Sequence, residues 1–469
     1  VEVSFSMPRA APKPLFAAFP GLLMACLTVG IALPQSAERG RRIGENSVAS
    51  ASIEWPMFKH DLRRTGYSPS KAPDTPNVIW ETKLPGGRRF WSSPCLVAGK
   101  LYVGNENGKL YSVDARTGRL VWTFSVGTGF PIYSSPAVSQ SRVFFAAYEM
   151  IYALPCADPD QDGKITADEI AWSFRVGKST GGVNNVVCGS PAVTRGRLFL
   201  GAVDQYFYCF DAAQGGDPLW ETFTPYKGQH AFSSSPAIDR GKVLAATGNQ
   251  SGSGRLYCFE EGSGRILWEF DLGDITFSSP VIEGNRVFIA NSGDWIGGSH
   301  TYRLYCLDVN GHLDDVDDGV PDEHRGNSDL IWSFDTGDYV YSSPSIHEGR
   351  IYYGCANGSL TCLNAVTGKP IWVYKIASRN RYTQPRGIMG SPAIADGKVF
   401  ISGMDGNIVA LPEIDPDGDG VISADEVIWS YSIGGDGVCS PIISNGHLYV
   451  GNHQGTLFSL GPAGVNGGR

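Results

Sequence analysis

Two stretches of the chain, residues 158–169 and 415–426, place oxygen-bearing side chains at the same intervals. In each, aspartates stand at positions 1, 3 and 5, a glycine stands at position 6, and a glutamate stands at position 12. This pattern supplies the oxygen cage that Ca²⁺ prefers, and the glycine permits the sharp turn. The sequence therefore predicts two calcium sites. Their ligands would be Asp158, Asp160, Asp162, Lys164 (carbonyl), Thr166 and Glu169 in the first, and Asp415, Asp417, Asp419, Val421 (carbonyl), Ser423 and Glu426 in the second.

Both stretches resemble the calcium loops of EF-hand and dockerin-type proteins. They depart from that pattern because no entering helix precedes them, and Trp172 and Trp429 follow too soon for a full exiting helix. The alternative interpretation is an acidic surface loop that stays solvated without a metal.

Residues 308–329 form a third acidic segment with less regular spacing. It is a third candidate metal site, with Asp314, Asp315, Asp317, Asp318 and Asp322 as ligands. The three segments hold 18 of the 47 acidic residues but only two basic ones, Lys164 and Arg325. The net charge of −9 is therefore concentrated locally and does not indicate a generally acidic surface that seeks basic partners.

The rest of the chain, which must hold these loops, repeats one unit eight times. A Ser-Pro pair begins each unit, and consecutive pairs lie 42 to 64 residues apart. A series of eight tryptophans follows the same period, which is typical of propeller blades. The pairs begin at Ser93, Ser135, Ser190, Ser235, Ser279, Ser343, Ser391 and Ser440, and the tryptophans are Trp80, Trp122, Trp172, Trp220, Trp268, Trp332, Trp372 and Trp429.

The clearest unit, residues 343–372, reads as four short strands. Its Asn357-Gly358 pair predicts a two-residue type I′ hairpin. Trp80 precedes the first Ser-Pro pair, and no tryptophan follows the last one. We therefore expect the strand around Trp80 to complete the last sheet and close the ring. The predicted fold class is all-β, an eight-bladed β-propeller of four-stranded blades.

Residues 55–68 (WPMFKHDLRRTGYS) and the turns at 114–119 (DARTGR) and 364–369 (NAVTGK) resemble the PQQ-like β-propeller repeat family of exported bacterial proteins. The resemblance covers roughly residues 55–460 and implies the propeller fold. It leaves the function open, because such repeats serve both quinoprotein dehydrogenases and outer-membrane assembly scaffolds. A quinoprotein would use pyrroloquinoline quinone (PQQ) with Ca²⁺. This sequence lacks the adjacent cysteines that such enzymes often carry, so it gives PQQ weaker support than Ca²⁺.

Arg9 and Lys13 precede an uncharged, mostly apolar run at residues 15–33, which is typical of a secretory signal. The run is also long enough for an uncleaved membrane anchor. We predict a signal peptide at 1–37, a linker at 38–54, the propeller at 55–461 and a tail at 462–469. The chain is expected to be exported to the periplasm or cell surface, and to meet a membrane only through an uncleaved leader.

In four-stranded blades, the third-to-fourth turns share one face of the ring and the blade-to-blade crossings share the other, so the acidic segments should lie on one face. The opposite face collects arginine and aromatic residues, as recognition surfaces do. The aromatic residues just before the Ser-Pro pairs, such as Phe232 and Phe277, are expected to pack between blades. The candidate recognition residues are Arg88, Arg89, Trp295, Arg379, Arg381 and Arg386.

No HExxH or GxSxG motif occurs, and the eight histidines are scattered. We therefore predict a non-catalytic, monomeric binding or scaffold module with calcium-binding loops. Its partner would be an unidentified protein or small ligand on the face opposite those loops, and no nucleic acid is expected. The alternatives are a PQQ-dependent dehydrogenase-like quinoprotein and an outer-membrane assembly scaffold-like protein.

Overall fold

The computed structural model describes residues 54–127, 129–177, 189–224, 231–248, 254–292, 301–311, 330–376 and 387–462. The chain divides into two compact units, Val1–Ser50 and Ala51–Arg469, and the described residues all belong to the second. The predicted signal peptide, the linker up to residue 53 and residues 463–469 of the predicted tail lie outside them. Within the described ranges, no helix is both long enough and apolar enough to cross a membrane.

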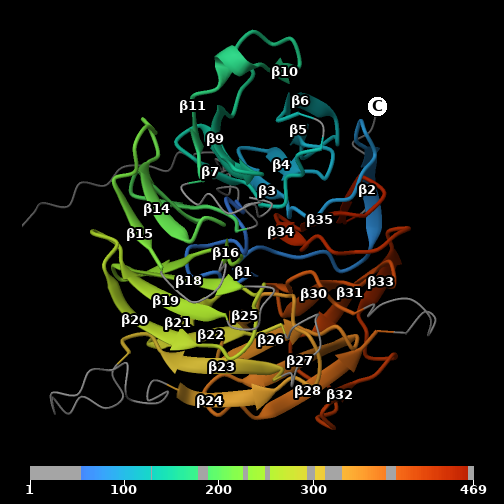
Figure 1. Cartoon of the computed structure of the whole chain (residues 1–469). Coiled ribbons are helices and arrows are strands. Elements are labelled where there is room, and N and C mark those ends of the chain that lie inside the picture. The colour runs from blue at the N-terminus through green and yellow to red at the C-terminus, as the bar shows by residue number, and fades with distance from the viewer. Residues whose placement is uncertain are drawn as a thin grey trace, which may run out of the picture. The chain divides into compact units, whose positions relative to one another are not determined.

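Eight β-sheets form the eight blades of a ring, and each blade contains four antiparallel strands, which confirms the predicted fold class (Figure 1). From the inner to the outer strand, blades 1 to 4 are β3 (Cys95–Val97), β4 (Lys100–Gly104), β5 (Lys109–Asp114) and β6 (Leu120–Ser125); β7 (Ala137–Ser139), β8 (Arg142–Ala147), β9 (Met150–Pro155) and β11 (Trp172–Arg175); β12 (Ala192–Thr194), β13 (Arg197–Gly201), β14 (Tyr206–Asp211) and β15 (Trp220–Phe223); and β17 (Ala237–Asp239), β18 (Lys242–Gly248), β19 (Arg255–Glu260) and β20 (Ile266–Asp271), with β16 (Ala231–Phe232) also paired to β18.

Blades 5 to 8 follow the same order. They are β21 (Val281–Glu283), β22 (Arg286–Ala290), β23 (Arg303–Asp308) and β24 (Leu330–Asp335); β25 (Ser345–His347), β26 (Arg350–Gly354), β27 (Ser359–Asn364) and β28 (Pro370–Lys375); β29 (Ala393–Ala395), β30 (Lys398–Ser402), β31 (Asn407–Pro412) and β33 (Trp429–Ser432); and β34 (Ile442–Ser444), β35 (His447–Gly451), β36 (Thr456–Gly461) and β2 (Asn77–Lys83).

The eighth blade is closed as the sequence predicts. Strand β2 pairs antiparallel with β36, with Trp80 opposite Ser459. The first strand of the repeat region therefore completes the sheet that ends the chain. This pairing leaves no open seam in the ring, so neither terminal blade exposes a free edge to the next molecule.

The core lies in layers between neighbouring blades, because successive residues of a strand point to opposite faces. In β26, Ile351 and Tyr353 pack into the core facing blade 5, whereas Tyr352 packs into the core facing blade 7. All three side chains are buried, which explains why the repeat strands are apolar at almost every position.

The Ser-Pro pairs form a closed hydrogen-bonded ring around the axis. The backbone N–H of each serine donates to the hydroxyl oxygen of the serine in the next blade, at 2.9–3.1 Å, and Ser440 returns the ring to Ser93. Proline has no N–H to satisfy at this crowded position. The repeat therefore uses serine to link blades and proline to begin the inner strand.

The tryptophans link the same blades at the rim. In seven seams, the indole N–H donates to the carbonyl that follows the third strand of the next blade. In the eighth seam, Trp429 donates to Pro73, which precedes the closing strand. The two sequence series thus correspond to an inner ring and an outer ring of contacts between blades.

The hairpin at Asn357-Gly358 corrects one prediction. Gly358 has φ +85°, but Asn357 does not have a positive φ, and the Gly358 N–H donates to the Cys355 carbonyl. A type I′ turn would need a positive φ at both residues. The connection between the two strands is instead four residues long, from Cys355 to Gly358, and resembles a type I turn that ends in a left-handed glycine.

Candidate metal sites

Each predicted calcium loop docks on the blade that precedes it. In the loop of blade 2, β10 (Lys164–Ile165) pairs parallel with β6 of blade 1, with Lys164 opposite Thr123. In the loop of blade 7, β32 (Val421–Ile422) pairs parallel with β28 of blade 6, with Val421 opposite Val373. Both loops therefore lie at the outer edge of the ring, and each adds a fifth strand to a neighbouring sheet (Figure 1).

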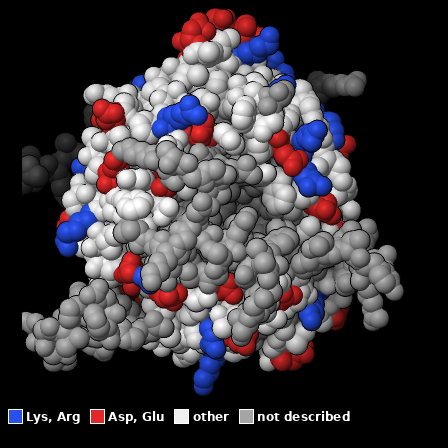
Figure 2. All heavy atoms as spheres, viewed as in Figure 1, with Lys and Arg blue, Asp and Glu red and all other residues white. Residues whose placement is uncertain are grey.

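The predicted ligands at positions 1, 3 and 5 converge in both loops. Carboxylate oxygens of Asp158, Asp160 and Asp162 lie within 4.8 Å of one another, and so do those of Asp415, Asp417 and Asp419. Acidic side chains accordingly gather at the rim over β10 and over β32 (Figure 2). Backbone bonds fix this shape, because the N–H of the position-6 glycine donates to the position-1 aspartate at 2.7 Å in one loop and 2.8 Å in the other.

The position-12 glutamate closes each loop from the other side. One oxygen of Glu426 accepts the backbone N–H of Ser423 at 2.7 Å, and Glu169 accepts that of Thr166 at the same distance. Residues Ala167–Glu169 form a single 3₁₀ turn (η1) that brings Glu169 back to the loop. The other oxygen of Glu426 is buried and has no hydrogen-bond partner among the described residues. A buried carboxylate oxygen without a donor suits a metal ligand, because leaving it unpaired is costly.

The carboxylates also repel one another. The backbone N–H of Asp419 lowers the pKa of Asp417, but local desolvation and the charges of Asp419, Glu426 and Asp415 outweigh it and raise that pKa above its ordinary value, although the side chain is exposed. In the first loop, the N–H of Asp162 lowers the pKa of Asp160, but burial and the neighbouring acidic groups again raise it. Among the described residues, no ion pair with a basic side chain is seen for these crowded carboxylates. Such a set of oxygen donors suits a divalent metal ion.

The loops also cover the tryptophans beneath them. Trp122 is 0% exposed and Trp372 is 1% exposed, whereas Trp80, Trp172 and Trp268 are 8–9% exposed. Ile165 of β10 belongs to the core around Trp122, and Ile422 of β32 belongs to the core around Trp372. Each loop therefore seals a seam between two blades as well as presenting its carboxylates to solvent.

The other predicted site residues lie mostly outside the described residues. The third acidic candidate, at Asp314, Asp315, Asp317, Asp318 and Asp322, is among these, and so are Trp295, Arg379, Arg381 and Arg386. Arg88 and Arg89 are exposed, as expected for a recognition face. Of the aromatic residues expected to pack, Phe232 is fully buried, but Phe277 is 43% exposed and stacks only loosely on Tyr341, so the packing prediction is wrong for Phe277.

The structural role of residues 54–71, here called the axial segment, was not predicted. This segment runs along the inner strands of successive blades. Trp55 pairs with Leu96 of blade 1, and β1 (Tyr67–Ser68) pairs parallel with β29 of blade 7. In between, carbonyls of the segment accept the backbone N–H of the residue two places after the repeat proline, at 2.7–3.0 Å, from Val138, Ile238, Ile282, Ile346 and Ile394.

Two basic side chains of the axial segment are buried on the axis. The ammonium of Lys59 donates to the carbonyls of Ser343 and Pro344 and to the hydroxyl of Ser345. The guanidinium of Arg64 donates to the carbonyls of Phe58, Pro191 and Pro236 at 2.6–3.2 Å. Burial lowers the pKa of Lys59 well below its ordinary value. The repeat carbonyls that face the axis thus receive their donors from the same chain, which explains the basic residues in this segment.

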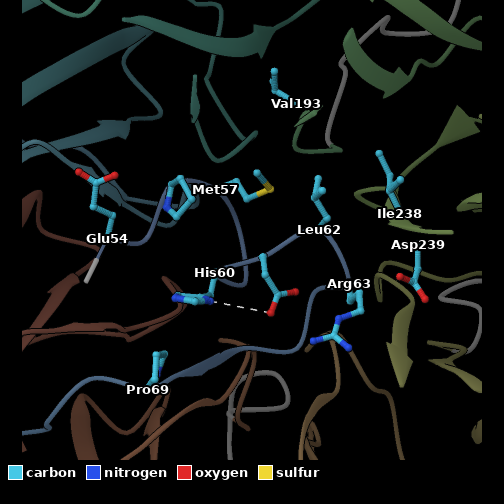
Figure 3. A pocket seen from close by; sticks show the side chains of 11 residues that line it. Glu54, Met57, His60, Leu62, Arg63, Pro69, Val193, Ile238 and Asp239 are labelled. Carbon is cyan, nitrogen blue, oxygen red and sulfur yellow. Dashed lines mark ion pairs between the residues drawn. The ribbon is translucent and has the colours of Figure 1, made fainter. Parts of the chain in front are cut away.

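A cavity of about 710 Å³ opens where the axial segment passes blades 3 and 4 (Figure 3). Its walls are apolar at Met57, Leu62 and Ile238, and charged at Arg63 and Asp239. Asp61 lies in the same cavity. Burial alone would raise its pKa, but the imidazole of His60 beside it, 3.8 Å away, and hydrogen bonds from Thr65 outweigh burial and lower it. Nothing in the sequence pattern indicated this cavity.

The fold and the repeat define a class, the β-propellers built from PQQ-like repeats. Within that class, the family model described as outer membrane protein assembly factor BamB matches residues 71–167 and 203–463, and the chain belongs to this family.

Relatives of at least two kinds match this chain. BamB of Yersinia pestis is 23% identical over 368 residues, which are 74% of this chain and 80% of the relative. Quinohemoprotein alcohol dehydrogenase of Comamonas testosteroni is 24% identical over 315 residues, which are 60% of this chain and 40% of the enzyme.

Solved structures repeat this division. The structure of the Comamonas testosteroni enzyme matches with a TM-score of 0.64 at 15% identity and covers 88% of this chain and 81% of the enzyme chain. BamB from Moraxella catarrhalis matches with a TM-score of 0.56 at 12% identity and covers 84% of this chain and 99% of that chain. At these identities the likeness shows the fold, and the function must be argued from the sites.

Proposed function

We propose that this protein is an exported, non-catalytic binding scaffold whose two rim loops bind Ca²⁺. The observation that carries the proposal is the position of the loops. Each brings three aspartates together beside the strand that docks on the preceding blade. A bound Ca²⁺ would neutralise the mutual repulsion of the carboxylates and hold that strand in place.

This position favours a structural role for the metal. One loop pairs with the outermost strand β6 and the other with the outermost strand β28, whereas the inner strands and the axial segment line the axis. An ion at the rim cannot polarise a substrate that binds near the axis. We therefore propose that Ca²⁺ fastens two seams of a rigid ring, and that the ring itself presents surfaces to partners in the cell envelope.

Membership of the BamB family favours a protein partner, and a role in outer-membrane assembly is the most direct extension of the relatives' names. Co-purification with a membrane β-barrel assembly complex would support this role. Failure to recover any envelope protein from the exported fraction, with and without Ca²⁺, would count against it.

The calcium proposal is tested by thermal melting of the purified chain with Ca²⁺ and with a chelator. We expect chelation to lower the melting temperature, and we expect the double variant Glu169→Gln plus Glu426→Gln to lose most of that difference. The matched control is Asp168→Asn plus Asp425→Asn, which removes the same charge from position 11, where the carboxylates accept the hydroxyls of Thr166 and Ser423. An identical melting curve with and without chelator would refute structural calcium.

The similarity to a quinohemoprotein alcohol dehydrogenase favours a second candidate, a PQQ-dependent dehydrogenase-like activity. When bound, the quinone would supply the redox chemistry, and the ring would supply its binding site. Adding PQQ and Ca²⁺ to the purified protein and measuring dye-linked oxidation of alcohols and sugars tests it. Turnover would displace the scaffold proposal.

A further inference from the structure

The two calcium loops share their ligand geometry but differ in the surface around it. At the loop of blade 7, four large aliphatic side chains are exposed: Ile371 by 36%, Ile414 by 63%, Val421 by 46% and Ile428 by 39%. At the loop of blade 2, the equivalent positions are occupied by smaller or charged residues, namely Val121, Ala157, Lys164 and Ala171. Because the two backbones pair in the same way, loop closure does not require the aliphatic set.

Four exposed side chains and the half-buried Val373 surround this loop and are here called the rim patch, made of Ile371, Val373, Ile414, Val421 and Ile428. Ile371 is the extra residue of a bulge in β28, and a Cβ on Gly420 of the loop would lie 3.7 Å from its carbonyl oxygen. Val421 lies opposite Val373 in the parallel pair and shares its face of the sheet, whereas Ile422 points inward. Ile414 and Ile428 flank the same loop, one directly before Asp415 and the other two residues after Glu426.

We infer that the rim patch is a docking surface for a partner protein segment that combines apolar and basic side chains. Clustered exposed aliphatic residues mark interaction sites more often than they mark neutral surface. The patch is bordered by the five acidic residues of loop 415–426, so even one bound Ca²⁺ leaves the loop negative, and the exposed Lys369 and Lys375 at the two ends of β28 offset only part of that charge. A second copy of this chain would bring the same negative charge, whereas lysine or arginine beside the apolar residues would be attracted.

Strand β32 defines the form of the segment. It is the outermost strand of a five-stranded sheet, and its exposed residue is β-branched. An extended segment with alternating basic and apolar residues could lie along this edge with its apolar side chains on the patch. The inference rests on the proposal that the protein is a binding scaffold, and it names the chemistry of one partner.

The test uses two fluorescein-labelled peptides and the complete protein. One peptide alternates lysine with valine over seven residues, and the other has serine in place of each valine. Fluorescence anisotropy in the presence of Ca²⁺ should show that the wild type binds the valine peptide at least tenfold more tightly than the serine peptide. Binding of the two peptides with equal affinity would mean that only charge is recognised, and this would overturn the inference.

The chain supplies its own matched variants. Ile371→Val, Ile414→Ala and Ile428→Ala together install the residues that blade 1 and the loop of blade 2 already carry at these positions, so folding should be preserved. This triple variant should lose at least tenfold in affinity for the valine peptide. The variant Val121→Ile, Ala157→Ile, Lys164→Val and Ala171→Ile, which installs the whole aliphatic set at the loop of blade 2, should gain a second site. Unchanged binding in both variants would refute the rim patch as the site.

Analytical ultracentrifugation tests whether a second copy of this chain, rather than a basic partner segment, occupies the rim patch. If the wild type self-associates and the triple variant does not, the patch joins two copies of the chain, and the basic-segment inference is wrong. The calcium proposal is tested independently, because none of the three substituted residues is a proposed metal ligand. A triple variant that loses peptide binding but keeps its chelator-sensitive melting would support both proposals. Unchanged peptide binding in the triple variant would refute the rim patch, whereas a wild type whose melting does not respond to chelator would refute the calcium proposal.

Discussion

Neighbouring blades are fastened at the rim in two different ways. In five seams, the tryptophan of one blade packs on a glycine of the next blade's third-to-fourth turn, and a Cβ on that glycine would lie 2.3–2.7 Å from the indole. In two seams, the glycine turn is replaced by an acidic loop whose strand lies over the tryptophan. The glycine seams are Gly118 on Trp80, Gly215 on Trp172, Gly264 on Trp220, Gly311 on Trp268 and Gly368 on Trp332.

We expect the packing at the two kinds of seam to differ in its dependence on metal. A glycine seam depends only on close contact between backbone and indole, so it should be indifferent to metal. A loop seam buries its tryptophan more completely, but the loop that contains the covering strand carries carboxylates that repel one another without a cation. The loop seams should therefore be the stronger contacts with Ca²⁺ and the first to open without it.

Truncating one tryptophan of each kind gives the largest expected effect. Trp372→Ala should lower the free energy of unfolding by about 4 kcal/mol in Ca²⁺, because it empties a fully buried site. Trp332→Ala, at a glycine seam where the indole is partly exposed, should cost about 3 kcal/mol. Urea unfolding followed by circular dichroism measures both. If Trp332→Ala costs more than Trp372→Ala in Ca²⁺, the loop does not strengthen its seam.

Substituting a seam glycine should have the next largest effect. Gly368 has φ +68°, and a Cβ there would lie 2.7 Å from the ring of Trp332. Gly368→Ala should cost about 3 kcal/mol, from the left-handed backbone and from the clash together.

The matched control for this glycine is Gly349→Ala. Gly349 has φ +70°, but nothing lies within 4 Å of an added Cβ. It should cost only about 1 kcal/mol, the backbone penalty alone. Both costs should be the same with and without chelator, and a chelator-dependent cost at Gly368 would contradict the proposed independence of the glycine seams.

Much of this architecture could be predicted because it repeats. Serine and tryptophan recur once per blade, so the number of blades, the closing strand at Trp80 and the seam positions could be read from their spacing. The ligand pattern at Asp158 and Asp415 is local in sequence, and the structure brings those carboxylates together as expected.

The features that could not be predicted depend on contacts made once. The axial segment is held mainly through its own backbone carbonyls and through Lys59 and Arg64, and these bonds leave no periodic trace in the sequence. Strands β10 and β32 have only two residues each, too few for an alternating pattern. The cavity at Asp61 likewise exists only because the segment passes blades 3 and 4 at that height.

A smaller effect is expected at the strand that covers the loop seam. Ile422 of β32 is 2% exposed and packs in the core around Trp372. Ile422→Ala should cost about 2 kcal/mol in Ca²⁺, less than a central core position because the two-residue strand can detach locally. In chelator, where the strand is expected to be loosened already, the cost should fall below 1 kcal/mol. Equal costs under both conditions, measured by urea unfolding, would show that the strand is held without metal.

The smallest effect is expected in the inner ring, which passes through both kinds of seam. Ser135→Ala removes the acceptor for the Ser93 N–H at a loop seam, and Ser235→Ala removes the acceptor for the Ser190 N–H at a glycine seam. Each should cost about 1 kcal/mol, the value of one buried hydrogen bond, and both should be insensitive to chelator. The reason is distance across the blade, since the serines begin the inner strands while the loops cap the outer ones. A chelator-dependent cost at Ser135 alone would mean that the rim loop stabilises the blade across all four strands as far as the axis. The two kinds of seam would then differ along their whole depth and not only at the rim.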